Sequence, residues 1–296
     1  MRKLGNRLFA ESFNQGLRFN MLFLAPELMD TLNISLFPAS IYNYIKEEVG
    51  TAVAKGSPGS EGDYIDSLVD LRNKGGWEGN DGEIIEPNDD VLVGHMFMFY
   101  TAGFETTASG VTFILLEAAR NPDLQIKLKE EIKDVYAKYE GKLTFEALNE
   151  LTYLTSFITE CFRKYPPFPF IDRKCTTDYN IPGTDIVIQR GTRVMIPMQG
   201  LQNDKKFYED PDSIIPERFE NNKVETDKPY FPFGTGPRQC LGMRFALLMM
   251  KLSVLACLRN HSISVNKATP IYLKMSPKRF GTTPMDDVFL DIRRDE

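Results

Sequence analysis

One cysteine stands where a loop gives way to a helix. Residues 231–242 read Phe-Pro-Phe-Gly-Thr-Gly-Pro-Arg-Gln-Cys-Leu-Gly, and an apolar run suited to a helix follows from Met243 to Leu258. Glycine and proline keep the loop out of a helix, so Cys240 is expected near the N-terminus of the helix that follows. Free N–H groups there stabilise a thiolate, the form of cysteine that attacks electrophiles or binds a metal. An isolated cysteine is more often a small buried apolar residue, so the neighbouring residues decide.

An acid and a hydroxyl lie inside the longest predicted helix. This helix is expected over about residues 87–120, because Pro87 suits a first turn and Asn121-Pro122 ends the segment. Glu105 and Thr106 interrupt its apolar middle, and a buried acid needs a reason. One explanation is a bend in which Thr106 bonds back along the helix. The alternative is that the two side chains have a functional role.

The third set of residues with distinctive chemistry is an acidic and a basic side chain on one helix. Glu160 and Arg163 lie three positions apart on a helix predicted from about Thr152 to Tyr165, so they share one face. An exposed pair of this kind contributes little to stability.

The cysteine loop resembles that of a known family. Phe233, Gly236, Arg238, Cys240 and Gly242 form the pattern F-x-x-G-x-R-x-C-x-G, which resembles the haem-binding loop of the cytochrome P450 family. The resemblance implies that Cys240 ligates haem iron, that Arg238 binds a haem propionate and that Phe233 lies near the sulfur. These residue types suit those roles, since a thiolate donates electron density through the iron and a guanidinium matches a carboxylate.

A stretch of the longest predicted helix resembles the same family. Ala102-Gly103-Phe104-Glu105-Thr106 is similar to its motif A-G-x-[D/E]-T. The resemblance implies that Gly103 leaves room beside the iron and that Glu105 and Thr106 relay protons to dioxygen.

Two further features resemble the family in the same order along the chain. Glu160 and Arg163 match its E-x-x-R pair, and Arg218, within Pro-Glu-Arg-Phe, would be the third member of that network. Arg173 resembles a second arginine that binds a haem propionate.

The expected fold is mainly α with small β-sheets (α+β), corresponding to the C-terminal portion of the cytochrome P450 fold. Residues 1–296 would form a single domain that lacks the family's N-terminal anchor and early helices. Alternation predicts strands within 177–198, and closing strands are expected within 267–293. Asn121 is expected to cap the helix that follows it.

Composition narrows the functional classes. The net charge of −6 argues against a nucleic-acid partner. The four cysteines form no C-x-x-C and the two histidines are far apart, so a zinc or iron–sulfur framework is not expected. The apolar stretch 16–37 packs in a core or dips into a membrane interface. The resemblance favours membrane contact, since this stretch is similar to the family's substrate-entry region.

The resemblance implies a haem-thiolate monooxygenase that inserts one oxygen atom from O2 into a lipophilic small molecule. It implies haem b as cofactor and electrons from NADPH through NADPH–cytochrome P450 reductase, with cytochrome b5 as a further candidate partner. The residues within these motifs resemble those of insect microsomal detoxification members of the family. This resemblance implies a location on the cytoplasmic face of the endoplasmic reticulum membrane. The alternatives are a haem-thiolate isomerase or dehydratase, which would leave Glu105 and Thr106 idle, and a non-catalytic fragment unable to hold haem.

Overall fold

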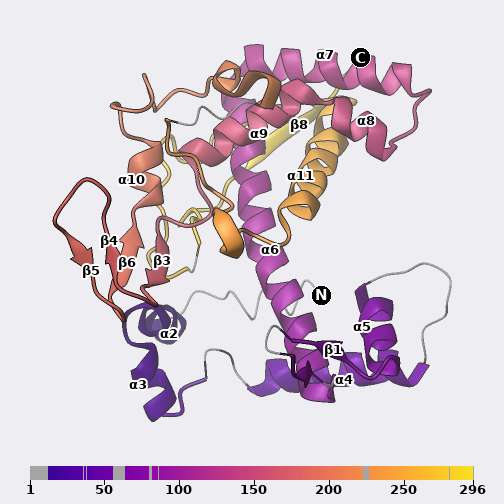
Figure 1. The fold of residues 1–296 in the computed structure, drawn as a ribbon. Coiled ribbons are helices and arrows are strands. Elements are labelled where there is room, and N and C mark those ends of the chain that lie inside the picture. Colours follow the sequence, from indigo (N-terminus) through magenta and orange to yellow (C-terminus); the bar gives the residue numbers. More distant parts are fainter. Residues whose placement is uncertain are drawn as a thin grey trace. The chain divides into compact units, whose positions relative to one another are not determined.

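The computed structural model describes residues 13–35, 37, 39–55, 64–79, 82–85, 87–222, 227–279 and 281–295. The chain divides into two compact units, Met1–Glu105 and Thr106–Glu296. The division falls within the longest helix, α6 (Asp89–Arg120), which runs through the centre of Figure 1.

The first unit consists of helices and one small hairpin. Its elements before α6 are α2 (Phe13–Leu24), α3 (Pro26–Thr31), α4 (Ala39–Lys55), α5 (Tyr64–Asn73), β1 (Trp77–Glu78) and β2 (Ile84–Ile85), the two strands pairing antiparallel. A small core joins α4, α5 and the start of α6, and consists of Ile41, Ile45, Leu68, Leu92 and Val93.

Charges from two helices hold the first turn of α6. Asp89 accepts a hydrogen bond from Arg72 of α5 at 2.8 Å. Asp90 accepts one from Lys46 of α4 at 3.2 Å and another from the hydroxyl of Tyr42. Acidic side chains also suit this end, where the helix dipole is positive.

Four leucines of the apolar stretch 16–37 lie on the surface. Leu17, Leu22, Leu28 and Leu32 are exposed, whereas Met29 is buried. Core packing therefore accounts for only part of this stretch. None of the described helices is both long and apolar enough to cross a bilayer.

The second unit holds the remaining elements. They are α7 (Pro122–Lys138), α8 (Phe145–Glu150), α9 (Thr152–Lys164), β3 (Ile171–Lys174), β4 (Tyr179–Asn180), β5 (Val187–Ile188), β6 (Arg193–Ile196), α10 (Met198–Gln202), the 3-10 helices η1 (Pro216–Asn222) and η2 (Gly236–Arg238), α11 (Met243–Leu258), β7 (His261–Val265) and β8 (Leu290–Arg294). The strands pair antiparallel as β3–β6, β4–β5 and β7–β8, each a two-stranded sheet. This content agrees with the expected mainly α fold with small sheets.

A single core in this unit joins the end of α6 with α7, α9 and α11 (Figure 1). Gly110 permits the closest approach. A Cβ at this position would lie 2.9 Å from Cε of Met250 in α11 and 3.0 Å from Cζ of Phe162 in α9. Glycine therefore sets how closely α6 packs on both helices.

The start of α9 is capped by a neighbouring helix. The residue before α9 is Leu151, which cannot cap it with its own side chain. Instead, the carboxylate of Glu131 in α7 accepts hydrogen bonds from the backbone N–H groups of Tyr153 at 2.6 Å and Leu154 at 2.8 Å. These are among the N–H groups that a helix leaves without an internal partner.

Two local predictions are wrong. Asn121 occupies the N-cap position of α7 as expected, but its side chain does not cap the helix, because its amide donates backward to the carbonyl of Glu117 at 2.8 Å. The closing strands are not confined to 267–293, since β7 (His261–Val265) lies before that range and β8 ends one residue beyond it, at Arg294. Pro270, Pro277 and Pro284 punctuate the intervening segment, and proline cannot donate to a strand ladder.

Candidate functional site

The cysteine loop is a tight, glycine-dependent turn. Gly234 and Gly236 have φ of 72° and 70°, a conformation that side chains disfavour. The backbone N–H of Cys240 donates to the carbonyl of Phe233 at 2.8 Å, closing the loop. Gly242 is the N-cap of α11, so Cys240 lies just before the helix, with its side chain exposed.

Phe162 links this loop to α6. The ring of Phe233 packs edge-on against that of Phe162, with centroids 5.3 Å apart. Phe162 is also one of the two side chains beside Gly110, which lies about one helical turn beyond Thr106. The cysteine loop and the stretch of α6 that begins at Thr106 therefore share a packing partner within the second unit.

The motif of α6 spans the division between the units. Glu105 is buried at 8% exposure, whereas Ala102 and Gly103 are exposed. A Cβ on Gly103 would meet no atom within 4 Å. Thr106 is half-buried and belongs to the second unit.

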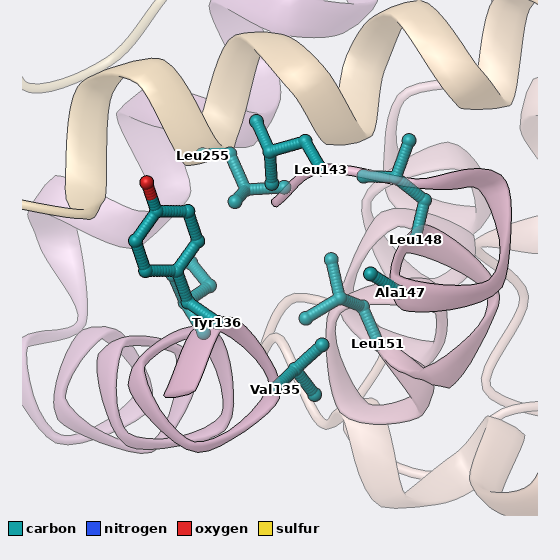
Figure 2. Close-up of a pocket in the computed structure, with 8 residues that line it drawn as sticks. Val135, Tyr136, Leu143, Ala147, Leu148, Leu151 and Leu255 are labelled. Atoms are coloured by element: carbon teal, nitrogen blue, oxygen red, sulfur yellow. The ribbon is translucent and has the colours of Figure 1, made fainter. Parts of the chain in front are cut away.

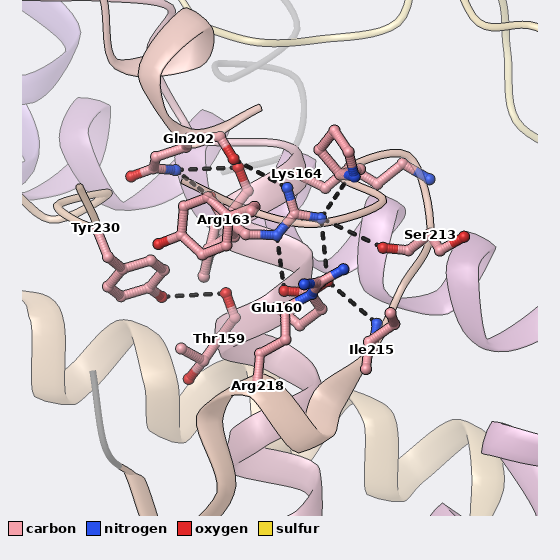
Figure 3. A network of polar contacts seen from close by, with 12 residues as sticks. Thr159, Glu160, Arg163, Lys164, Gln202, Ser213, Ile215, Arg218 and Tyr230 are labelled. Atoms are coloured by element: carbon pink, nitrogen blue, oxygen red, sulfur yellow. Dashed lines mark hydrogen bonds and ion pairs between the residues drawn. The ribbon is translucent and has the colours of Figure 1, made fainter. Parts of the chain in front are cut away.

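Glu160 and Arg163 form a buried, bidentate pair. Arg163 donates from Nε to Oε2 of Glu160 at 2.8 Å and from Nη2 to Oε1 at 3.0 Å. Both side chains are 0% exposed. The alternative of an exposed pair is therefore excluded, and the network that they begin is shown in Figure 3.

The same two side chains organise an irregular segment. Arg163 donates to the carbonyls of Gln202 at 2.9 Å and Pro211 at 2.7 Å. Glu160 accepts from the N–H of Ile215 at 3.1 Å, and its Oε1 lies 3.4 Å from Nε of Arg218. Arg218 thus joins the network, as expected from the sequence, through a longer ion pair.

Sequence reasoning missed Gln202, which connects this network to the cysteine loop. The side chain is 0% exposed. Its Nε2 donates to the carbonyls of Phe162 and Arg163, each at 3.0 Å, and its Oε1 accepts from the N–H of Phe231 at 3.0 Å. No motif marks an isolated glutamine, so only the fold reveals it.

Two tyrosines, also missed, hold the approach to the loop. Tyr208 donates to the carbonyl of Pro229 at 3.1 Å, and the guanidinium carbon of Arg163 lies 5.2 Å from its ring centroid. Tyr230 donates to the carbonyl of Thr159 at 3.1 Å, and burial raises the pKa of Tyr230. Their only sequence signal is aromatic character beside the segment that contains Arg218.

Another buried acid, Glu117, ties α6 to the end of α9. Glu117 is 2% exposed and accepts a hydrogen bond from the hydroxyl of Tyr165 at 2.6 Å. Lys164 and Arg120 approach the same oxygen at 3.3 and 3.4 Å. Burial, and then the charge of Glu117, raise the pKa of Tyr165. The sequence marks Glu117 only as an acid within an apolar run, as it does Glu105.

The two arginines predicted to bind propionates are both exposed. Arg173 lies on β3 and donates to the carbonyl of Asp172 at 2.8 Å, whereas Arg238 ends η2. Neither forms a salt bridge among the described residues. Their guanidinium groups are accessible to an anionic ligand.

The donor set suits haem better than a bare metal ion. In the described part of the chain, no three side chains of His, Cys, Asp or Glu gather as a metal-binding group. Cys240 offers one sulfur ligand. Haem iron needs only such a single ligand from the protein, because the macrocycle itself supplies four nitrogen ligands. The exposed sulfur, the glycine turn and the accessible arginines fit this group.

Figure 2 shows a cavity between α7, α8 and α11 that does not serve as such a site. Its volume is about 10 Å³, and leucine, isoleucine, valine and alanine side chains line it together with Tyr136. This is room for about one water molecule. The cavity is a packing gap.

Comparison with known proteins identifies the relatives of this chain. A sequence model of the family described as Cytochrome P450 matches residues 2–289. Cytochrome P450 6l1 of Blattella germanica is 34% identical over 92% of this chain and 54% of its own length. Cytochrome P450 6B1 of Papilio polyxenes is 35% identical over 95% and 58%, and cytochrome P450 6a2 of Drosophila melanogaster 32% over 99% and 59%. The chain spans little more than half the length of these relatives.

Proposed function

The chain belongs to the cytochrome P450 family, and from this premise we propose that it provides the thiolate side of a haem monooxygenase. The proposed reaction inserts one oxygen atom from O2 into a lipophilic small molecule, with electrons from NADPH through a reductase. The observation that carries the proposal is the exposed thiol of Cys240 on a turn closed by its own backbone N–H.

The residues of the second unit would hold haem b as follows. Cys240 would ligate the iron, and Arg173 and Arg238 would pair with the propionates, consistent with their exposed guanidinium groups. Phe233 would stay near the sulfur, because it accepts the hydrogen bond of the Cys240 N–H and packs on α9. Gly236 and Gly242 would let the backbone approach the macrocycle. When bound, the haem supplies oxygen activation.

We assign proton delivery to Glu105 and Thr106. Glu105 is buried, whereas nearby Gly103 is exposed and has no atom within 4 Å of the position that a Cβ would take. An acid in this position can pass protons to a ligand that occupies the space beside Gly103. Thr106→Ala should release more peroxide per NADPH consumed, and unchanged coupling would remove Thr106 from this role.

The proposal includes a reductase, with cytochrome b5 as a second donor, and residence at the cytoplasmic face of the endoplasmic reticulum. Exposed leucines of the first unit support membrane contact. Leu28→Ser with Leu32→Ser should reduce flotation of the chain with phosphatidylcholine vesicles. Equal flotation would exclude this stretch as the contact.

The test is a reduced, carbon-monoxide-bound difference spectrum of the full chain reconstituted with haem. Wild type and Cys257→Ala, whose thiol is half-buried in α11, should show the thiolate-ligated band. Cys240→Ala should lose it. A spectrum from Cys240→Ala identical to that of wild type would refute the ligand assignment. Failure of wild type to take up haem would favour the non-catalytic fragment.

A further inference from the structure

Two carbonyls at the end of α9 bond to one buried side chain of α10. The last carbonyls of a helix have no partner within that helix. Nε2 of Gln202 donates to the carbonyls of Phe162 and Arg163, each at 3.0 Å, and both residues belong to the last turn of α9. The two donors of this amide are therefore both used at one helix end (Figure 3).

The oxygen of the same carboxamide reaches the cysteine loop. Oε1 of Gln202 accepts from the N–H of Phe231, the first residue of that loop, at 3.0 Å. The amides of Gln199 and Asn203 also bond to the end of α9, donating to the carbonyl of Lys164 at 3.1 and 3.3 Å. Within the described part of the chain, neither of these two side chains bonds to the loop. Gln202 differs from both because it bridges two segments.

Arg163 also fixes the main chain of Gln202. Its Nη1 donates to the carbonyl of Gln202 at 2.9 Å, and Glu160 holds the same guanidinium through two hydrogen bonds. Gln202 is 0% exposed, so a change of its rotamer would leave buried polar atoms without partners. The carboxamide is therefore held in place from both its backbone and its own polar atoms.

Hydrogen bonds continue from Phe231 to Cys240. The carbonyl of Phe231 accepts from the N–H of Gly234 at 2.8 Å, and the carbonyl of Phe233 accepts from the N–H of Cys240 at 2.8 Å. The ring of Phe233 packs against that of Phe162, whose carbonyl Gln202 also binds. The loop is thus attached to the end of α9 twice, through this ring contact and through the carboxamide.

We propose that Gln202 is a positioning residue for the sulfur of Cys240. It fixes the start of the loop against the end of α9, and so places the turn that presents the thiolate. This inference rests on the proposed function, in which that thiolate ligates haem iron. A glutamine suits the task because one uncharged side chain supplies two donors for the helix end and an acceptor for the loop.

Hydrogen exchange of the chain without haem tests the attachment. Gln202→Met keeps a side chain of similar length but removes all three hydrogen bonds. The N–H of Phe231 then loses its acceptor and the loop loses its attachment, so the amides of Phe231 and Cys240 should exchange about tenfold faster or more. Gln199→Met is the matched control, since it removes a bond to the same helix end but none to the loop. It should leave both amides as in wild type.

The carbon-monoxide difference spectrum of the chain reconstituted with haem tests the consequence. Gln202→Met should lose most of the thiolate-ligated band per haem bound, whereas wild type and Gln199→Met should keep it. Far-UV circular dichroism establishes that each variant is folded. If Gln202→Met does not fold, Gln202→Asn replaces it, because its carboxamide is one methylene too short to reach both the helix end and the loop. It should show the same two changes.

Three results would overturn the inference. The first is an unchanged exchange rate at Cys240 in the folded Gln202 variant. The second is equal acceleration by Gln199→Met, which would indicate a general loss of stability. The third is a loop that exchanges faster while the thiolate-ligated band stays intact. A wild-type chain without this band would instead contradict the proposed function, and exchange at Cys240 would still decide whether Gln202 holds the loop.

Discussion

Replacing Glu160 with glutamine removes a charge that buried groups share. The carboxylate accepts two hydrogen bonds from Arg163 and one from the N–H of Ile215, and it lies 3.4 Å from Nε of Arg218. Glutamine keeps the volume but carries no charge, and its amide nitrogen cannot accept a hydrogen bond. Glu160→Gln therefore leaves the guanidinium of Arg163, itself 0% exposed, without its counter-charge.

The expected cost is set by burial. Removing one partner of a buried pair costs about 3–5 kcal/mol, because the remaining charge stays desolvated. We expect about 3 kcal/mol, since the remaining oxygen of glutamine can still accept. With a urea dependence of about 2 kcal/mol per molar, the unfolding midpoint should fall by about 1.5 M.

Far-UV circular dichroism should be used to follow this unfolding transition. Tryptophan fluorescence would not report on it, because Trp77, the only tryptophan, belongs to the first unit. Glu217→Gln is the matched control. Glu217 pairs with Lys127, but the two side chains are 45% and 52% exposed, and such a pair contributes about 0–1 kcal/mol. A change below about 0.5 kcal/mol for Glu160→Gln would refute the argument from burial.

Three further changes probe other parts of the fold. Glu131→Ala should destabilise the second unit by about 1–2 kcal/mol in urea, through loss of the α9 cap, whereas the exposed Glu130→Ala should change it by less than about 0.5 kcal/mol. Gly281→Ala should cost about 1–3 kcal/mol, because the added carbon would lie 2.9 Å from a backbone carbonyl oxygen, whereas Gly200→Ala meets nothing closer than 3.9 Å and should be close to neutral. Hydrogen bonds from a tyrosine and a lysine hold the pKa of Asp90 below its ordinary 3.8. The ionised carboxylate of Asp90 therefore contributes to folding stability above pH 3.8, and this contribution is lost as pH falls through the lowered pKa of the folded state. Asp90→Asn should unfold more readily than wild type at neutral pH, as followed by tryptophan fluorescence. This difference should vanish once pH is below the folded-state pKa of Asp90.

Elements with local causes could be predicted from the sequence. The helix after Cys240 spans Met243–Leu258 as its apolar run indicates, and Thr144 caps α8 through its own side chain, which accepts from the N–H of Ala147. Such signals lie within a few neighbouring positions, where residue type and spacing report them.

Contacts between distant segments could not be predicted in the same way. Glu131 caps a helix more than twenty positions away, and Arg163 bonds to carbonyls that any residue could supply. Gln125 of α7 bonds to both the N–H and the carbonyl of Ile263 in β7, a contact between segments more than a hundred positions apart. Sequence reasoning thus found the residues with distinctive chemistry but not the backbone groups that hold them.

The network around Arg163 also sets an order of folding. The segment from 203 to 215 contains no helix or strand, and carbonyls within it bond to the guanidinium groups of Arg163 and Arg218. It therefore has little structure to form until α9 exists. Mutations that weaken α9 should slow refolding, and the approach to Cys240 should become ordered last. α9 also precedes the cysteine loop in the chain, so synthesis produces α9 first.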